Sequence, residues 1–485
     1  MEPAGLLSLP IEVVHHLSSF LSVEDVLSCS LTCHYLRLAL NDNTVWKRYL
    51  PEQDLTRLES MEQHVQPTFQ LGQTLTPLCD NRIHFMRKTR ILNNWREGNF
   101  VEFSETLDFT YADALFNRRR GQGQLIYKDR YLFLSRFVND IESNAIEIWD
   151  MVQDPILFTS IEIDDVNYDS FFIIGTKLVV IKCIKVDVYE ITVPDKTFPL
   201  IYSFIITEEN VVYNKKCHHT GLCDDRCVGW SHYAAGQYLL CNKCGHERHE
   251  CILHVWNISS ATKSGTFLSP RDGFSVNLYS FVGNELILKQ CVQCSSDQYY
   301  FHFDIKNQMF SDTVFEYKEY ADHMIFHKSY VIVFRYDGNS DTEYLHYLLC
   351  ILYNFFTSSE IKRRRFKNRM EYYGLNSTTV IDGKFVLICN DYFHIIDVCS
   401  LETIDRFKCN PDVVYITHQI NLHGSLFIIT ADTNSSLGLW DVEKKKKVNV
   451  ELKSSRLHHL YVNELCTVLV SFDFWKRKLR ILHCW

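Results

Sequence analysis

The chain has 485 residues, of which 46% are hydrophobic and 14% aromatic, and its formal net charge is −9. This length exceeds that of an ordinary single domain, and the apolar content is sufficient for extensive hydrophobic cores. The negative charge argues against a global attraction to nucleic acid or anionic membranes, and no segment reaches the roughly 20 apolar residues of a membrane helix.

The N-terminus, MEPAGLLSLP, lacks the basic and apolar regions of a secretory signal. We therefore expect a protein of the cytoplasm, the nucleus or both, in which the sequons at Asn257, Asn376 and Asn434 have no role. Eight of the 18 cysteines stand singly on apolar runs, where we expect them to be buried as reduced thiols.

The first 50 residues predict three short helices. Pro10 suits a helix start, because its missing N–H donor needs no partner there. Ser22 and Asp25 have the spacing of a capping box for the second helix. The apolar residues exceed what three small helices can bury among themselves. This surplus predicts either a face that binds a partner or a helical cap packed on the rest of the chain.

This segment resembles an F-box. The resemblance rests on Leu9-Pro10, on FLSVEDVL at 20–27, on SLTC at 30–33 and on Val45-Trp46-Lys47. Cys33-His34 departs from the Ser-Lys or Asn-Arg of many members. F-boxes bind the Skp adaptor of cullin-based ubiquitin ligases through such apolar faces. The resemblance implies that the adaptor-binding residues are Leu9, Pro10, Ile11, Leu17, Phe20, Leu21, Val26, Leu27, Leu31 and Trp46.

Residues 51–97 are polar, mixed in charge and poor in β pattern, which predicts a linker of short helices between two domains. The segment NNWREGNF at 93–100 is similar to an element that precedes the propeller in F-box proteins with WD repeats, Asn-Trp-x-x-Gly.

From residue 98 onwards a unit recurs at spacings of 40 to 67 residues: an apolar strand such as KLVVIKC, a polar turn, and a second strand. The second strands end at Trp149, Tyr189, Trp256, Phe303, Tyr353, Ile396, Trp440 and His483. Such repetition predicts an all-β propeller of eight blades, with seven as the alternative. The units resemble WD repeats, although Trp-Asp is literal only at 149–150 and 440–441. NFVEFSETLD at 99–108 can complete the last blade, so that strands from both ends of the domain close the ring.

A cysteine-rich insertion lengthens the third unit. Cys223 and Cys227, with Cys241 and Cys244, have the spacing of a closed four-ligand zinc site. Alternatively, Cys241 and Cys244 could join Cys291 and Cys294 of the next unit, or the insertion could be a polar surface loop with unligated cysteines. Any zinc is expected to be structural rather than catalytic, because the histidines of HERHE stand three apart rather than four. We expect no other cofactor.

Three basic runs occupy residues 118–120, 362–365 and 444–447. The last two follow third strands, so we expect them to be solvated surface. Arg118, Arg119 and Arg120 are the candidates for contact with a substrate phosphate. The chain has no glycine-rich phosphate loop and no nucleophile elbow, so we expect no active site of its own.

The resemblance implies a small all-α F-box (residues 1–50), a helical linker (51–97) and a WD-like β-propeller (98–485). It further implies the substrate-recognition subunit of an SCF-type ubiquitin ligase. The expected partners are the Skp adaptor, the cullin and RING core, and a protein substrate, phosphorylated or not, on the top face of the propeller. The alternative is a scaffold that binds the Skp partner, or another helical partner, without recruiting a cullin.

Overall fold

The structure is a computed structural model. It describes residues 8–50, 78–106, 125–128, 131–137, 144–150, 156–163, 168–182, 185–191, 198–206, 229–244, 251–268, 275–282, 285–291, 298–304, 307, 309–317, 319, 321–337, 346–368, 379–389, 391–410, 413–432, 437–450, 459–462, 466, 468–473 and 478–484.

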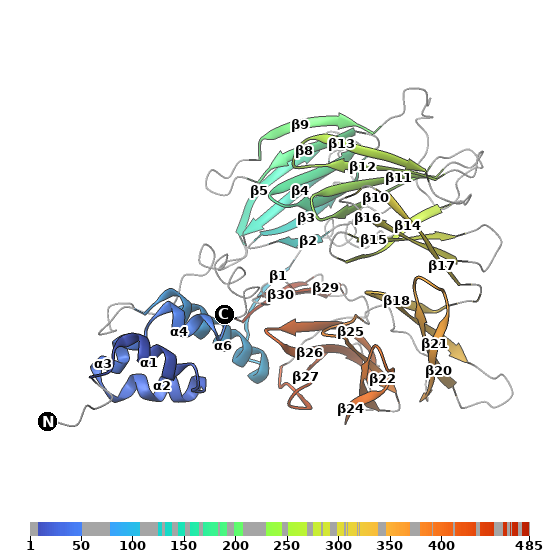
Figure 1. Cartoon of the computed structure of the whole chain (residues 1–485). Helices are drawn as coiled ribbons and strands as arrows, with labels where there is room; N and C mark the ends of the chain where they lie inside the picture. Colours follow the sequence, from blue (N-terminus) through green and yellow to red (C-terminus); the bar gives the residue numbers. More distant parts are fainter. Residues whose placement is uncertain are drawn as a thin grey trace.

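The N-terminal part is helical (Figure 1). It forms four short helices where the sequence predicts three: α1 (Ile11–Ser18), α2 (Val23–Thr32), α3 (His34–Ala39) and α4 (Asn43–Lys47). The longer α6 (Asp80–Glu97) lies in the predicted linker. No helix in the described ranges is long and apolar enough to cross a membrane.

Local capping explains where these helices begin. Pro10 precedes the first residue of α1, as predicted. The capping box at the start of α2 is confirmed, because the amide of Asp25 donates to the Ser22 hydroxyl and the Ser22 amide donates back to the Asp25 carboxylate. Cys33 ends α2 in extended backbone and begins α3, which turns the chain sharply between the two helices.

The described strands form eight antiparallel sheets in chain order. The first four are β2 (Leu125–Lys128), β3 (Tyr131–Phe137), β4 (Asn144–Asp150) and β5 (Ile156–Ile163); β6 (Tyr168–Ile174), β7 (Lys177–Lys182), β8 (Lys185–Glu190) and β9 (Leu200–Ile205); β10 (Gly229–Ala235), β11 (Tyr238–Cys244), β12 (Cys251–Asn257) and β13 (Thr262–Leu268); and β14 (Ser275–Val282), β15 (Glu285–Cys291), β16 (Gln298–Asp304) and β17 (Met309–Tyr317).

The remaining four sheets are β18 (His323–His327), β19 (Tyr330–Asp337), β20 (His346–Asn354) and β21 (Glu360–Asn368); β22 (Lys384–Cys389), β23 (Tyr392–Asp397) and β24 (Thr403–Lys408); β25 (Val413–Leu422), β26 (Ser425–Asp432), β27 (Leu437–Asp441) and β28 (Lys446–Lys447); and β29 (His459–Val462), β30 (Val468–Asp473) and β31 (Lys478–His483), joined by β1 (Val101–Thr106).

The apolar runs predicted as middle strands fall in the second strand of their sheets, except the run at 384–389, which forms β22, the first strand of a three-stranded sheet. The predicted unit endings fall in the strands that follow these runs. The burial of β7 shows why these runs are apolar throughout. Leu178 and Val180 pack in a core with the preceding sheet, whereas Val179 and Ile181 pack with the next one. Alternating side chains of one strand therefore fill two cores.

Every two sheets that are consecutive from β2 to β31 share such a hydrophobic core. Antiparallel sheets of three or four described strands that pack face to face in chain order are the arrangement of a WD-like β-propeller, which confirms the predicted fold class. The closure of all eight sheets into one ring of eight blades stays a prediction.

The last sheet confirms the predicted use of strands from both ends of the domain. Its order is β1–β31–β30–β29, and β1 pairs antiparallel with β31 along its whole length, from Val101 opposite His483 to Thr106 opposite Lys478. The helix α6 leads directly into β1, so the helical part is attached at this sheet (Figure 1).

Candidate protein-interaction surface

A compact core holds the N-terminal helices together. It contains Trp46 and Val26, both fully buried, with residues from α1, α3 and α4 around them. The indole N–H of Trp46 donates to the carbonyl of Leu40 at 2.7 Å, so its one polar atom is satisfied inside the core. The ring also lies 5.3 Å from that of Phe85 on α6, which joins the helical unit to the linker helix.

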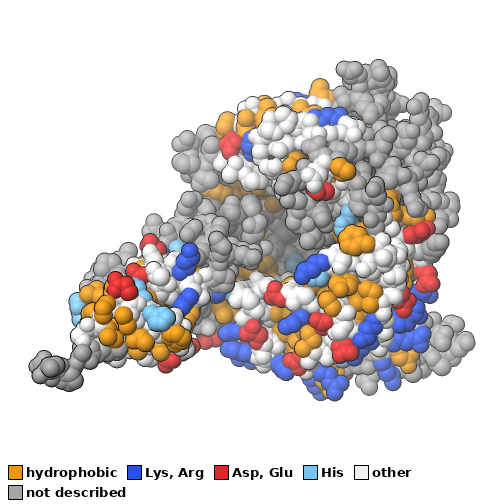
Figure 2. All heavy atoms as spheres, viewed as in Figure 1, with side chains coloured by type: hydrophobic (Ala, Val, Ile, Leu, Met, Phe, Trp, Pro, Cys, Tyr) orange, Lys and Arg blue, Asp and Glu red, His pale blue; other side chains and the backbone are white. Residues whose placement is uncertain are grey.

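The surface of this unit exposes large apolar side chains, and Figure 2 shows hydrophobic surface over the N-terminal helices. Phe20 and Leu31 are the most exposed, at 76% and 74%. A contiguous apolar surface of this kind is typical of a protein-binding site, because water contact with it is unfavourable. We call it the apolar face, formed by Pro10, Ile11, Val13, Leu17, Phe20, Leu21, Leu31 and Leu38.

The structure corrects the predicted set of adaptor-binding residues. Val26 and Trp46 belong to the core and offer no side-chain surface to a partner, and Leu9 and Leu27 are half-buried against that core. The unit is so apolar that helical spacing alone does not separate inward from outward positions. For the same reason the predicted set does not include Val13 and Leu38, which are exposed.

The linker helix α6 is anchored in the propeller by Trp95, which is fully buried. Its indole N–H donates to the carbonyl of Cys466 at 2.7 Å and lies 3.1 Å from the thiol sulfur of Cys484. Asn94, beside it, donates to the Cys484 carbonyl at 3.0 Å. The Asn-Trp of the predicted linker motif therefore binds the last sheet directly, and Phe427 packs against the same indole.

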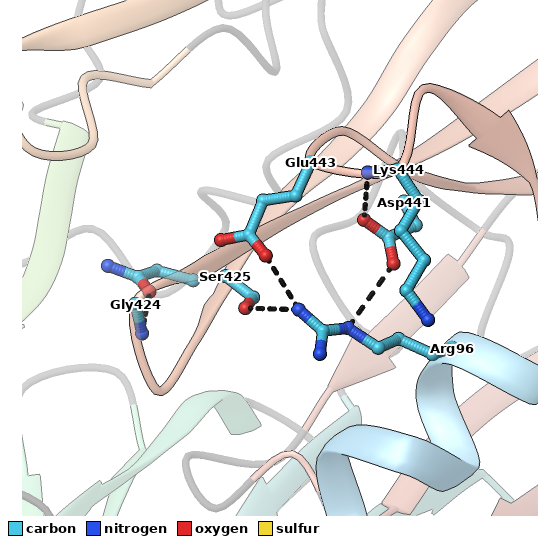
Figure 3. Close-up of polar contacts among 7 residues, drawn as sticks. Arg96, Gly424, Ser425, Asp441, Glu443 and Lys444 are labelled. Carbon is cyan, nitrogen blue, oxygen red and sulfur yellow. Dashed lines mark hydrogen bonds and ion pairs between the residues drawn. The ribbon is translucent and has the colours of Figure 1, made fainter. Parts of the chain in front are cut away.

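A second anchor is the guanidinium of Arg96, which reaches the β25–β28 sheet (Figure 3). It lies 3.4 Å from a carboxylate oxygen of Asp441, which is buried, and 2.6 Å from the exposed carboxylate of Glu443. It also donates to the hydroxyl of Ser425 at 3.1 Å. Asp441 is the aspartate of the literal Trp-Asp pair at 440–441. No pattern in the sequence indicates that the partner of Asp441 is an arginine of the linker helix.

Gly98 ends α6 in left-handed backbone with φ +76°. A Cβ placed there would lie 2.7 Å from the carbonyl oxygen of Asn449, closer than real Cβ contacts. Two features therefore require glycine at this position of the linker motif: the left-handed backbone conformation and the close approach of a neighbouring backbone.

The predicted zinc ligands are not all brought together. Cys241 is fully buried in the core between the β6–β9 and β10–β13 sheets, and burial raises the pKa of its thiol. A zinc site that includes Cys241 stays a prediction, since zinc binds the thiolate form. Cys244 and Cys291 end β11 and β15. Cys223, Cys227 and Cys294 lie outside the described residues, where a zinc site stays a prediction.

Among the side chains that the structure describes, no group of three or more His, Cys, Asp or Glu residues is arranged to hold a metal ion. Arg118, Arg119 and Arg120 lie outside the described residues, so their proposed phosphate contact stays a prediction. The run at 362–365 lies on β21, the outermost strand of its sheet, as expected for a solvated run.

Comparison with known families tests the interpretation of the helical unit. Residues 6–52 match the model of the F-box-like family. The N-terminal unit is F-box-like. The apolar face therefore belongs to a domain type that binds other proteins, and the buried Trp46 is part of the core of that domain. No curated protein matches the sequence.

Solved structures resemble the chain at low identity. They include BamB from Moraxella catarrhalis (12% identity, TM-score 0.37, 66% of this chain and 82% of that chain) and a chain of the mitotic checkpoint complex (10%, 0.38, 66% and 88%). The WD40 domain of Neurospora crassa Pan2 is a third (6%, 0.36, 75% and 89%). Likenesses this distant add nothing to the sheet order and packing described above.

The F-box-like domain and the WD-like propeller are both interaction modules. Together they indicate a protein-interaction adaptor.

Proposed function

We propose that the protein is the substrate-recognition subunit of an SCF-type ubiquitin ligase. The observation that carries this proposal is the pair of side chains Phe20 and Leu31, each about three-quarters exposed on an F-box-like domain. Burying both against a Skp-type adaptor would contribute about 3 to 5 kcal/mol. The cullin and RING core would then be recruited through the adaptor.

The attachment of the F-box-like domain to the propeller supports the same proposal. Phe85 near the start of α6 packs on Trp46, and Trp95 near its end is buried in the propeller. A substrate on the propeller would therefore be held at a defined distance from the adaptor. Its ubiquitination would be accelerated by high effective concentration rather than by side chains of this chain.

The test is affinity purification of the full chain from cells, with mass spectrometry of its partners. A Phe20→Asp/Leu31→Asp variant should lose a Skp-type adaptor and any cullin, because two carboxylates would be buried without partners. A Leu200→Asp variant is the matched control, since this leucine is 52% exposed on β9, away from the helical unit. It should retain the adaptor.

The outcomes separate the candidates. A Skp-type adaptor and a cullin that depend on Phe20 and Leu31 support the receptor role, and proteins retained by both variants become candidate substrates. Recovery of the adaptor without a cullin would favour the alternative, a scaffold outside the ligase. If the wild type recovers no adaptor, the proposal fails.

A further inference from the structure

Basic side chains gather on one flank of the propeller, over the sheets that contain β21 and β24 (Figure 2). These two strands are the outermost of neighbouring sheets, which share a hydrophobic core. We define the basic flank as Lys362, Arg364, Tyr392, His394, Arg406 and Lys408. A chain with a net charge of −9 thus concentrates positive charge at one place outside the F-box-like domain.

Two arginines of this flank lie near His394, Arg406 as its cross-strand partner and Arg364 through the ring of Phe366. Arg364 lies over the ring of Phe366 at 5.0 Å, and that ring lies 5.8 Å from the ring of His394. Arg406 is the direct cross-strand partner of His394. The charges of both arginines, after burial, lower the pKa of His394, which is consistent with their convergence on it.

Both arginines are positioned without neutralisation. The Arg364 guanidinium donates to the carbonyl of Leu401 at 2.8 Å, and that of Arg406 lies 5.7 Å from the ring centre of Tyr392. Neither makes an ion pair with any carboxylate in the described part of the chain. The neighbouring carboxylates pair with lysines instead, Glu402 with Lys362 of the flank and Asp405 with Lys445. Two guanidinium groups without a carboxylate partner among the described residues favour an anionic ligand.

We propose that the basic flank binds an acidic, extended segment of a partner polypeptide, whose carboxylates lie between Arg364 and Arg406. Tyr392, 38% exposed beside Arg406, offers an apolar surface to the methylene groups of such a segment. A nucleic acid fits less well, because it needs a long basic track along its backbone and the rest of the chain is net acidic. This inference does not depend on adaptor binding by the apolar face.

The probe is a fluorescein-labelled peptide of about twelve residues with alternating Glu and Ser, titrated with the full chain and followed by fluorescence anisotropy. An Arg364→Gln/Arg406→Gln variant should weaken binding roughly tenfold or more. The matched control, Lys446→Gln/Lys447→Gln, removes two positive charges from β28, the outermost strand of another sheet, and should change the affinity less than about twofold.

The single variant Arg406→Gln is not expected to disturb folding, because Arg406 is exposed and donates no side-chain hydrogen bond in the described structure. It therefore controls for misfolding of the double variant. It should still weaken peptide binding by roughly threefold or more, with an unchanged melting temperature. The proposal is overturned if the wild type does not bind the peptide, or if the β28 control loses as much affinity as the flank variants. It is also overturned if a single-stranded RNA of equal charge binds more tightly than the peptide.

Discussion

Two glycines in left-handed backbone differ in what surrounds them, so comparing them distinguishes the cost of backbone strain from the cost of crowding. Gly98 and Gly175 have φ values of +76° and +60°. A Cβ at Gly175 would meet no atom within 4 Å, whereas one at Gly98 would clash with the backbone of Asn449. Because that backbone follows β28, the end of α6 can approach the propeller this closely only with a glycine.

We expect Gly175→Ala to lower the free energy of unfolding by about 1 kcal/mol, the strain of a left-handed alanine. Gly98→Ala should lower it by at least about 2 kcal/mol more, because the Asn449 carbonyl must also move. Urea denaturation of the two variants beside wild type measures the difference. Equal losses would mean that the contact with Asn449 imposes no requirement.

His483 on β31 is buried, and burial lowers its pKa to about 4. The unfolded chain takes up this proton near pH 6.5 and the folded chain only near pH 4. Protonation therefore favours the unfolded state, and the free energy of unfolding should fall as the pH falls through this window. The contribution of this one group is about 2 kcal/mol between pH 7 and pH 5.

A His483→Gln variant cannot be protonated at this position. Its free energy of unfolding should therefore fall less between pH 7 and pH 5 than that of the wild type. Denaturation curves at pH 7 and pH 5 test this, because other titrating groups contribute equally to both proteins. An identical slope in wild type and variant would show that His483 is not the group responsible.

At the scale of elements, α6 connects two units through different chemistry at its two ends. Near its start, Arg82 lies 5.1 Å from the ring centre of Trp46, and Asn81 donates two hydrogen bonds to Asn43, one from its backbone amide and one from its side chain. Near its end, Trp95 and Arg96 contact the last two sheets. The first end is bound by aromatic and amide contacts and the second by a buried indole and an ion pair.

We expect Arg96→Gln to lower the free energy of unfolding by about 2 to 4 kcal/mol, because the buried carboxylate of Asp441 would lose its cation. Glu443→Gln should cost less than about 0.5 kcal/mol, since Glu443 is 48% exposed. Thermal melting of both variants provides the comparison. A loss in Glu443→Gln as large as that in Arg96→Gln would contradict the assignment of Asp441 as the energetically important partner.

Elements defined by local pattern were predictable from the sequence. The capping box at Ser22 needs residues only three apart, and the middle strands show as continuous apolar runs because both of their faces are buried. The fourth helix, α4, was missed because it spans only Asn43–Lys47.

Contacts between distant elements were not predictable. The indole of Trp95 donates to the carbonyl of Cys466, 371 residues later, and no local pattern in the sequence predicts that contact. Cys241 was assigned to a metal because its spacing from Cys244 fits zinc, although its position on a middle strand places it in a core. The spacing between the cysteines did not predict that burial.

At the scale of the whole molecule, β31 is the central strand of the junction between the two ends of the propeller. It pairs with β30 on one side and with β1 on the other. Cys484, directly after it, also contacts Trp95 on α6. Loss of β31 therefore removes an interior strand of the last sheet, the strand that pairs with β1, and a contact that anchors the linker helix.

We expect a chain truncated after residue 477 to lose cooperative folding, because β1 and β30 would both become unpaired edges. Limited proteolysis and thermal melting measure this. Lys446→Ala/Lys447→Ala, which alters the two-residue edge strand β28, should melt like the full chain. A truncated chain with the melting temperature of the full chain would show that β31 is dispensable.

The contact between Trp95 and Cys484 joins residues 389 positions apart, and this separation has a consequence during synthesis. A ribosome adding about 5 to 20 residues per second needs roughly 20 to 80 seconds to cover it. During that time the N-terminal helices have left the ribosome, while Trp95 and β1 remain without their partners Cys484 and β31. The F-box-like domain of a nascent chain could therefore meet a partner before the propeller is complete, and chaperones would have to shield the unpaired β1 until the last strand emerges.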